Sequence, residues 1–192
     1  IELAPDAVTD ELYPAVTADA AGVTVAWHAH RGAEYDIWAQ RLNLLGERLW
    51  GPNGLSLCSA PGTQTYPALA SDGNGGAFAT WLDHRSGSVG AYAQYATAEG
   101  VMAWGTGGTP ITEEQVVGIW PHVASDGRGG VFVAWTGPGP HPTGSSILAR
   151  RLGHGEAMRS ISRPQEPGPL RNSEGVFRQW CGWNHAPEHA NA

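Results

Sequence analysis

Two polar clusters at matching positions are the residues best suited to bind a ligand. Segments 27–31 and 81–85 each begin with Trp and place His and Arg three and four residues later. An Arg guanidinium can bind a carboxylate through two hydrogen bonds, and a His side chain changes its charge near neutral pH. The predicted ligand-binding residues are therefore His30, Arg31, Asp83, His84 and Arg85. The alternative is that each Arg only pairs with a neighbouring Asp and fixes its loop. The sequence favours this alternative, because the third copy of the segment has Thr-Gly-Pro at 136–138 in place of the polar residues.

Three Asp residues stand at Gly-bearing turns, where their carboxylates could bind calcium. Asp19, Asp72 and Asp126 each bring a single carboxylate to their turn, whereas Ca²⁺ takes several oxygen ligands around one ion. Asp side chains also stabilise turns by accepting hydrogen bonds from the backbone that follows. We therefore predict a turn-forming role for these residues.

The C-terminal tail holds two short motifs that resemble metal and haem sites. Residues 185–189 read His-Ala-Pro-Glu-His, but Pro187 interrupts the helix that a zinc-protease motif of this kind requires. Residues 181–185 read Cys-Gly-Trp-Asn-His, with Asn184 where haem attachment needs a second Cys. We expect no catalytic residue, no metal and no cofactor from these patterns.

Composition excludes several partners and leaves others open. The chain has 192 residues with a net charge of -7, and its longest basic run is the pair Arg150-Arg151, so no positive stripe for nucleic acid exists. No apolar stretch approaches the ~20 residues of a membrane span. A protein partner or a glycan remains, and a homo-oligomer or a subunit of a larger assembly stays open. Because the chain begins at Ile1 rather than Met, we expect a processed or truncated product and an extracytoplasmic location, either periplasmic, cell-surface or secreted.

The two cysteines leave their redox state open. Cys58 and Cys181 could form one disulfide or remain two free thiols, since a count of two does not decide. Pairing would require the C-terminal segment to close beside the first repeat.

An internal repeat of about 54 residues sets the architecture. Trp27, Trp81 and Trp135 stand 54 residues apart, and each follows an aromatic-Pro segment, a Gly-bearing turn and an apolar run. Gly 27 and Pro 14 together make roughly a fifth of the chain, against about 12% in ordinary proteins, which argues against helices. A repeat of this length that holds four β-type stretches is typical of a propeller blade.

Segments 67–81 and 121–135 carry the resemblance to a known family. Each runs from Pro through Asp-Gly-x-Gly-Gly to Trp, and this pattern resembles the repeats of bacterial exported proteins of β-propeller type, including sialidase-like ones. The resemblance implies a propeller fold, which hosts lectins, scaffolds, hydrolases and lyases alike. Residues 71–76 depart from the sialidase signature Ser-x-Asp-x-Gly-x-Thr-Trp, so the resemblance brings no catalytic residues.

The expected fold class is all-β, a β-propeller built of four-stranded antiparallel blades with about three and a half repeats. It has four blades if it closes and is otherwise a partial propeller. Residues 1–162 should hold three blades plus an N-terminal outer strand, and 163–192 a degenerate fourth half-blade and tail. The expected function is a non-catalytic binding or scaffolding module, an accessory subunit or surface-recognition protein. The alternative is a glycan-active, sialidase-like hydrolase whose active centre the sequence does not identify.

Overall fold

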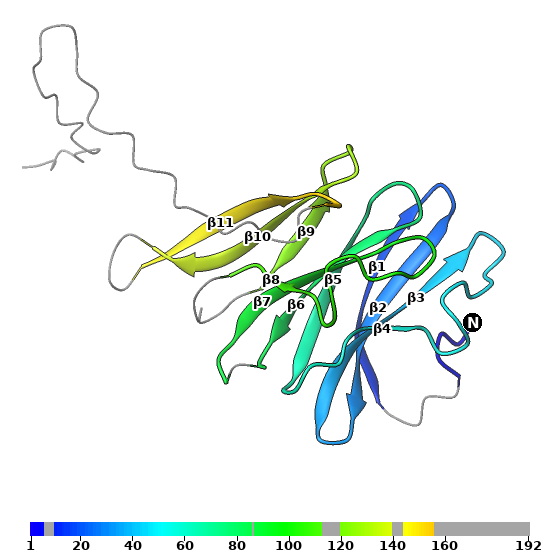
Figure 1. The fold of residues 1–192 in the computed structure, drawn as a ribbon, viewed down its shortest axis with the longest axis horizontal. Coiled ribbons are helices and arrows are strands. Elements are labelled where there is room, and N and C mark those ends of the chain that lie inside the picture. Colours follow the sequence, from blue (N-terminus) through cyan, green and yellow to red (C-terminus); the bar gives the residue numbers. More distant parts are fainter. Residues whose placement is uncertain (6–9, 86, 113–119, 140–143, 156–192) are drawn as a thin grey trace, which may run out of the picture. The chain divides into compact units, whose positions relative to one another are not determined.

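The computed structural model describes residues 1–5, 10–85, 87–112, 120–139 and 144–155, and these form an all-β protein (Figure 1). The described residues contain three antiparallel sheets and no helix, so none of them belongs to a helix that could cross a membrane. In each sheet the strands are neighbours in chain order, as expected when successive strands are joined by hairpins.

The strands follow the repeat. The first sheet contains β1 (Glu11–Asp19), β2 (Gly22–Arg31), β3 (Glu34–Asn43) and β4 (Leu55–Cys58). The second sheet contains β5 (Gln64–Ser71), β6 (Ala77–Asp83), β7 (Gly90–Ala96) and β8 (Thr109–Pro110). The third sheet contains β9 (His122–Ser125), β10 (Val131–Pro138) and β11 (Ser145–Leu152). The period read from the sequence thus predicts one sheet per repeat correctly.

The turn between the first two strands of each sheet is closed by its Asp. The Asp72 carboxylate accepts hydrogen bonds from the backbone N–H groups of Asn74 and Gly76, at 2.7 and 2.9 Å. Asp126 accepts from the equivalent pair, Arg128 and Gly130, at 2.7 and 2.8 Å. The predicted turn-forming role is confirmed.

The first and second sheets pack through small residues and one Trp. Ala26, Ile37 and Ala39 of the first sheet lie in one buried cluster with Ala79 and Trp81 of the second. Trp81 is fully buried, so this recurring Trp fills the space between the first and second sheets.

The second and third sheets pack in the same way with larger residues. Phe78 and Tyr95 of the second sheet share a buried cluster with Val131, Val133 and Trp135 of the third. The Trp of the later repeat again faces the earlier sheet, so the junction between sheets is itself a repeated unit.

A Gln and a Trp-Gly pair that occur at the same positions of the first two repeats fix the outer loop of a sheet. They are Gln40 and Gln94, with Trp-Gly at 50–51 and 104–105. The Gln94 side chain, fully buried, accepts the backbone N–H of Trp104 at 3.0 Å and donates to the Gly105 carbonyl at 2.8 Å. The Trp104 indole N–H then reaches the carbonyl of His154 at 3.2 Å, which lies beyond the third sheet's last described strand. One motif therefore joins a loop to its own sheet and to the following sequence repeat.

The structure describes the N-terminal segment of the chain but not its C-terminal segment. The N-terminal segment Ile1–Pro5 is not an outer strand; instead Leu3 and Ala4 pack beside Trp27, because the first sheet has no earlier sheet to cover that Trp among the described residues. The last residues of the third expected blade, 156–162, and the half-blade and tail expected at 163–192 lie outside the described residues. Their boundaries stay predictions, as does closure into a propeller.

Candidate functional site

Aromatic residues from all three repeats gather at one end of β1, β5 and β9, with Trp120 just before β9. Tyr13, Tyr66 and Trp120 occupy the same position in the repeat, directly before Pro14, Pro67 and Pro121. The ring centroids of Tyr13 and Tyr66 lie 4.7 Å apart, and those of Tyr66 and Trp120 4.9 Å apart, both in edge-to-face geometry. We call these three residues with His28 and Tyr35 the aromatic cluster.

Two of these rings remain open to solvent. Tyr13 is 56% exposed and Trp120 is 55% exposed, whereas Tyr66 between them is half-buried and packs against the core shared by the second and third sheets. Exposed aromatic side chains linked through such ring contacts are typical of binding surfaces rather than of a core.

An unusual backbone places the two tyrosines. The pairing of β1 with β2 shifts register between Leu12 and Ala15, and that of β5 with β6 shifts between Thr65 and Ala68, so each strand has a β-bulge at its Tyr-Pro. Tyr13 and Tyr66 have φ of 53° and 54°, a left-handed conformation that is uncommon outside glycine. Strained conformations of this kind persist where surrounding contacts hold them, and they concentrate at functional sites.

His28 is the contact that holds the bulge of the second sheet. Its Nδ1 accepts the backbone N–H of Tyr66 at 3.2 Å, and its ring lies 5.0 Å from Tyr13 and 4.8 Å from Tyr35. The side chain is 3% exposed, and burial lowers the pKa of His28 below its ordinary value. A neutral ring with an unprotonated Nδ1 is what this hydrogen bond requires.

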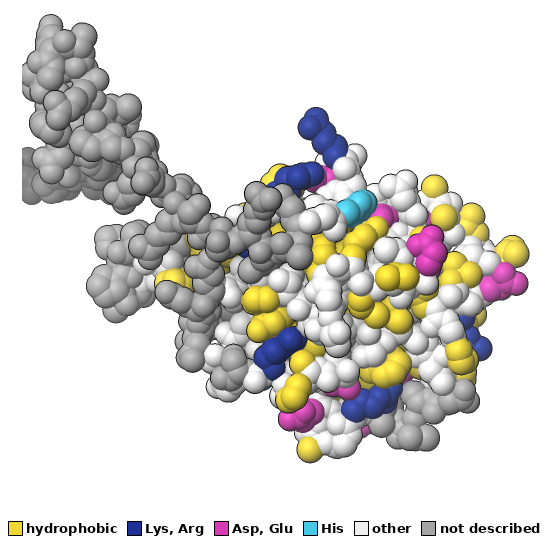
Figure 2. Space-filling model, in the orientation of Figure 1, with side chains coloured by type: hydrophobic (Ala, Val, Ile, Leu, Met, Phe, Trp, Pro, Cys, Tyr) yellow, Lys and Arg dark blue, Asp and Glu magenta, His cyan; other side chains and the backbone are white. Residues whose placement is uncertain are grey.

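A shallow pocket of about 380 Å³ lies over the aromatic cluster, within the size range of ligand sites. None of its described lining residues is Asp, Glu, Lys or Arg. The pocket is lined by Tyr13, Pro14, Ala15, Tyr66, Pro67, Ala68, Leu69, Trp120, Pro121 and His122. Figure 2 shows hydrophobic side chains spread among few charged ones over one face of the described part. The pocket is suited to a neutral ligand with a flat apolar face.

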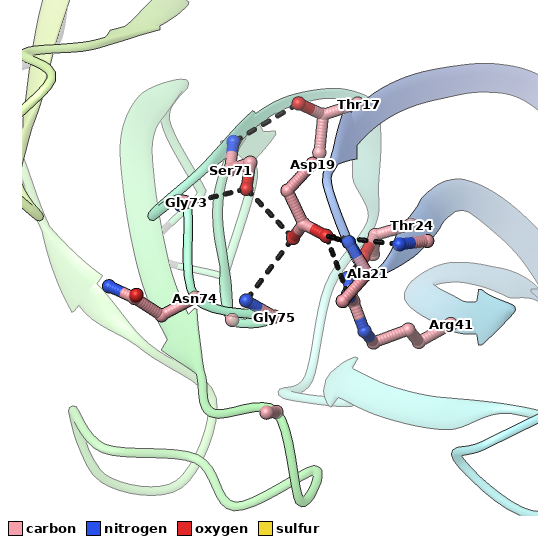
Figure 3. Close-up of polar contacts among 12 residues, drawn as sticks. Thr17, Asp19, Ala21, Thr24, Arg41, Ser71, Gly73, Asn74 and Gly75 are labelled. Carbon is pink, nitrogen blue, oxygen red and sulfur yellow. Dashed lines mark hydrogen bonds and ion pairs between the residues drawn. The ribbon is translucent and has the colours of Figure 1, made fainter. Parts of the chain in front are cut away.

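A second hollow of about 440 Å³ lies at the other end of the same three strands. Asp19 stands on its wall, but its carboxylate is already engaged: it accepts from Arg41 Nη2 at 2.9 Å, Ser71 Oγ at 3.1 Å and the N–H of Gly75 at 3.2 Å (Figure 3). Burial alone would raise the pKa of Asp19, and the bonds from Arg41 and the neighbouring backbone outweigh it and lower the pKa. This network ties the first sheet to the second and leaves little free charge for a ligand.

No group of three or more His, Cys, Asp or Glu residues in the described ranges could hold a metal ion. Cys58 is buried with a thiol in its free form. Burial raises the pKa of the Cys58 thiol. Cys181 lies outside the described residues, so its pairing with Cys58 stays a prediction.

The first predicted polar cluster lies beside the aromatic cluster. The His30 ring is 5.0 Å from the Tyr35 ring. The Arg31 guanidinium carbon lies 4.7 Å from the centroid of the Trp38 ring, a cation–π contact. The structure therefore places His30 against Tyr35 of the aromatic cluster, outside the pocket lining, and directs Arg31 onto its own sheet.

The second predicted polar cluster is an internal ion pair. Asp83 is 1% exposed and pairs with Arg85 at 2.6 Å, and Arg85 also donates to the Gly107 carbonyl at 2.7 Å. Arg85 Nη2 lies 3.1 Å from Cys58 Sγ, and its guanidinium stacks 4.0 Å from the Tyr92 centroid. His84 is exposed, and its backbone N–H donates to the Thr63 carbonyl at 2.9 Å. These contacts match the loop-fixing alternative, while ligand binding by the five residues stays a prediction.

The comparisons with known proteins give a likeness in fold. No protein-family model matches the chain, and no curated protein sequence matches it. A solved structure from work on the GH130 family of mannoside phosphorylases, which contains glycoside hydrolases that target β-1,2 mannosidic linkages in Candida mannan, is 12% identical with a TM-score of 0.49, covering 89% of this chain and 51% of that one.

Two further solved structures are described as putative glycoside hydrolases. The one from Parabacteroides distasonis is 12% identical with a TM-score of 0.45, covering 68% of this chain and 48% of that one. The one from Bacteroides ovatus is 10% identical with a TM-score of 0.46, covering 89% and 52%. The chain thus spans about half the length of the structures it is similar to.

These comparisons correct one expectation. The chain was expected to be a non-catalytic binding or scaffolding module and not an enzyme, whereas the solved structures of similar fold are described as glycoside hydrolases or come from a family of phosphorylases. The finding agrees with the alternative of a glycan-active protein. The resemblance to exported repeat proteins has no family match and stays a prediction.

The pH dependence of folding tests the role of His28. Because burial lowers the pKa of His28 in the folded protein, the unfolded chain binds a proton more readily than the folded one. The free energy of unfolding should therefore fall as pH drops through the ordinary His value of about 6.5 and stop falling, for this group, below the folded pKa. Urea titrations between pH 7.5 and 5 measure this loss. His28→Gln should flatten the slope, and His84→Gln, which changes an exposed His, should leave it as in the wild type. An equal slope in His28→Gln and the wild type would show that His28 is not the group responsible.

Proposed function

We propose that this protein is a glycan-active hydrolase of propeller fold and that a sugar ring docks on the aromatic cluster. In this proposal each of the three sheets is one blade, and β1, β5 and β9 are the innermost strands. An extracytoplasmic location, where extended glycans are met, remains part of the proposal.

The observation that carries the proposal is the set of three aromatic rings at equivalent positions of three repeats, of which Tyr13 and Trp120 are more than half exposed. Tyr13, Tyr66 and Trp120 contact one another in edge-to-face geometry and line one pocket of about 380 Å³. The C–H-bearing face of a pyranose ring is apolar, and burying it against an aromatic ring removes apolar surface from water. Tyrosine hydroxyls at the rim can meet the sugar hydroxyls, since Tyr combines an apolar body with a polar tip.

The lining supports a neutral saccharide over an acidic one. A sialic or uronic acid carries a carboxylate, for which a buried or half-buried Arg is the usual partner. The described lining contains no Arg or Lys. Of the two predicted Arg residues, Arg31 lies over the Trp38 ring and Arg85 donates to Asp83, Cys58 and Gly107. The proposed substrate is therefore a neutral glycan rather than the sialic acid that the sialidase-like alternative implies.

Hydrolysis needs a pair of carboxyl groups, and the pocket lining described does not supply them. Glu11 and Asp36 both have a pKa raised by burial. Both lie opposite Ala29 in the register of the first sheet, on the face that also carries Trp27 and away from the second sheet. The aromatic cluster is thus the docking surface, and the acid–base groups of the proposal come from outside the described lining.

The test is a panel of neutral and acidic oligosaccharides assayed for binding by calorimetry and for cleavage by release of reducing ends. The panel includes β-1,2-linked mannosides, the linkage named for the first similar structure. We expect binding of a neutral member and release of reducing ends without added phosphate. Turnover that requires inorganic phosphate and releases a sugar phosphate would contradict a hydrolase and indicate a phosphorylase. Binding confined to sialosides or uronides would contradict the neutral pocket, and absence of both binding and turnover on the whole panel would overturn the proposed function.

A further inference from the structure

His28 connects the first sheet to the backbone of Tyr66, although its own side chain lies outside the pocket lining. The His28 side chain is buried, and its Nδ1 accepts the backbone N–H of Tyr66 at 3.2 Å. Tyr66 lies within the register shift between Thr65 and Ala68, where the pairing of β5 with β6 is interrupted. The His28 ring thus takes the place of a strand partner for this N–H, and a titratable group is bonded to the backbone of a pocket residue.

His28 contacts both of the residues that adopt a left-handed backbone. Among the described residues other than glycine, positive φ occurs at Tyr13 and Tyr66. The His28 ring lies 5.0 Å from the Tyr13 ring and 5.7 Å from the Tyr66 ring. In the next repeat Leu82 has the place of His28, one residue after the Trp, and a Leu side chain offers no acceptor. Because a left-handed tyrosine persists only where contacts hold it, the conformation of Tyr66 depends on His28.

The side chains that surround the His28 ring carry no formal charge. Each of three neighbouring strands contributes one tyrosine: Tyr13 from β1, Tyr35 from β3 and Tyr66 from β5. His30, two residues further along β2, contacts the same Tyr35 ring at 5.0 Å. Glu11, Asp36 and Arg31 lie on the opposite face of the first sheet. Burial lowers the pKa of His28, and no described carboxylate faces the ring to stabilise an imidazolium there.

We propose that His28 is the positioning residue of the aromatic pocket, and that its protonation releases Tyr66 and weakens saccharide binding in acid. A protonated imidazole has a donor on each nitrogen, so Nδ1–H would face the Tyr66 N–H and their hydrogen bond is lost. Tyr66 then loses the contact that holds its backbone. Because the Tyr66 ring lies between those of Tyr13 and Trp120, both ring contacts of the pocket change with it. The loss of saccharide binding rests on the proposed function, whereas the release of Tyr66 does not.

The direction of the pKa shift sets the pH range of the switch. The ordinary pKa of a His side chain is about 6.5, and burial lowers that of His28, so the folded protein keeps a neutral ring at neutral pH and charges it only below about pH 6.5. Only the neutral form holds the pocket in its binding conformation. The apparent affinity for a saccharide should therefore fall with the fraction of neutral ring, by about tenfold per pH unit below the folded pKa.

The first test needs no saccharide. NMR of the full chain follows the His28 ring and the Tyr66 amide as pH is lowered from 7.5 to 4.5, and circular dichroism reports whether the fold is retained. Both resonances should shift with one midpoint, below about pH 6.5, while the fold persists. In His28→Asn the side-chain oxygen replaces Nδ1 as an acceptor that does not titrate, so the Tyr66 amide should stay unchanged with pH. An amide that does not follow the His28 ring, or that shifts only as the whole protein unfolds, would overturn the proposal.

The second test measures binding of the best neutral oligosaccharide by calorimetry over the same pH range. The wild type should lose affinity in acid, and His28→Asn should show a level affinity. His122→Gln removes the His of the pocket lining and should keep the acid loss, which separates the two groups. An acid loss that persists in His28→Asn, or that disappears in His122→Gln, would overturn the role of His28. Absence of binding at pH 7.5 would contradict the proposed function instead, and the Tyr66 amide would then decide the switch by itself.

Discussion

Asp83→Ala is expected to lower the free energy of unfolding by about 3–5 kcal/mol, the cost of breaking a buried ion pair by removing one partner. One Asp83 oxygen accepts the backbone N–H and Nε–H of Arg85, both at 2.9 Å. The other accepts Arg85 Nη2 at 2.6 Å and the indole N–H of Trp81 at 2.9 Å. Alanine would leave the half-buried Arg85 guanidinium without a counter-ion and the buried Trp81 indole N–H without its acceptor. Urea denaturation of the two proteins measures the difference.

A double-mutant cycle shows whether the unpaired charge causes the loss. Arg85→Ala together with Asp83→Ala should cost less than the sum of the single variants, because the double variant leaves no buried cation behind. Additive losses, or a single-variant cost of Asp83→Ala below about 1 kcal/mol, the range of surface pairs, would show that the pair is not the internal brace described above.

Trp120→Ala is expected to weaken saccharide binding by about 30-fold, since a central Trp at a binding surface contributes about 2 kcal/mol or more. The Trp120 ring contacts the Tyr66 ring at 4.9 Å and is 55% exposed, so its removal opens the pocket without emptying the core. Calorimetric titration with the best neutral oligosaccharide measures the dissociation constant. The melting temperature should change little.

The matched control for this variant is Leu45→Ala, which truncates an apolar side chain that is 83% exposed outside the pocket. Its dissociation constant should equal that of the wild type. Equal weakening in both variants would point to a general surface effect rather than to docking on the aromatic cluster.

The sequence predicts the sheets well because their determinants recur. Trp81 and Trp135 lie 54 residues apart, and the Asp-Gly-x-Gly-Gly turn before each fixes a hairpin through local hydrogen bonds. Contacts of this kind depend on residues close in the chain, so the pattern is visible without a structure.

The aromatic cluster is harder to predict from the sequence, because the contact that holds it is long-range. The His28 ring accepts the backbone N–H of Tyr66, 38 residues away, and nothing in the sequence around His28 indicates that partner. The bulges at Tyr13 and Tyr66 also follow no turn motif. The signal in the sequence that marks the cluster is the aromatic-Pro pair at the same position of all three repeats.

The polar cluster after Trp81 is predictable only in its local part. The sequence favours pairing of Arg85 with the neighbouring Asp83, which the structure shows, but it does not reveal that Gly107 and Cys58 approach Arg85 from two other segments and use its donors. Segments brought together by the sheets, rather than the spacing along the chain, decide which charges remain available.

Transfer of magnetisation from protein to sugar, observed by saturation-transfer NMR, tests the central claim most directly. A neutral oligosaccharide in excess should receive saturation on the ring protons of its apolar face from the wild type and from Leu45→Ala. The transfer should be lost or much reduced with Trp120→Ala. Undiminished transfer with Trp120→Ala, or none from the wild type with any neutral oligosaccharide of the panel, would contradict docking on the aromatic cluster.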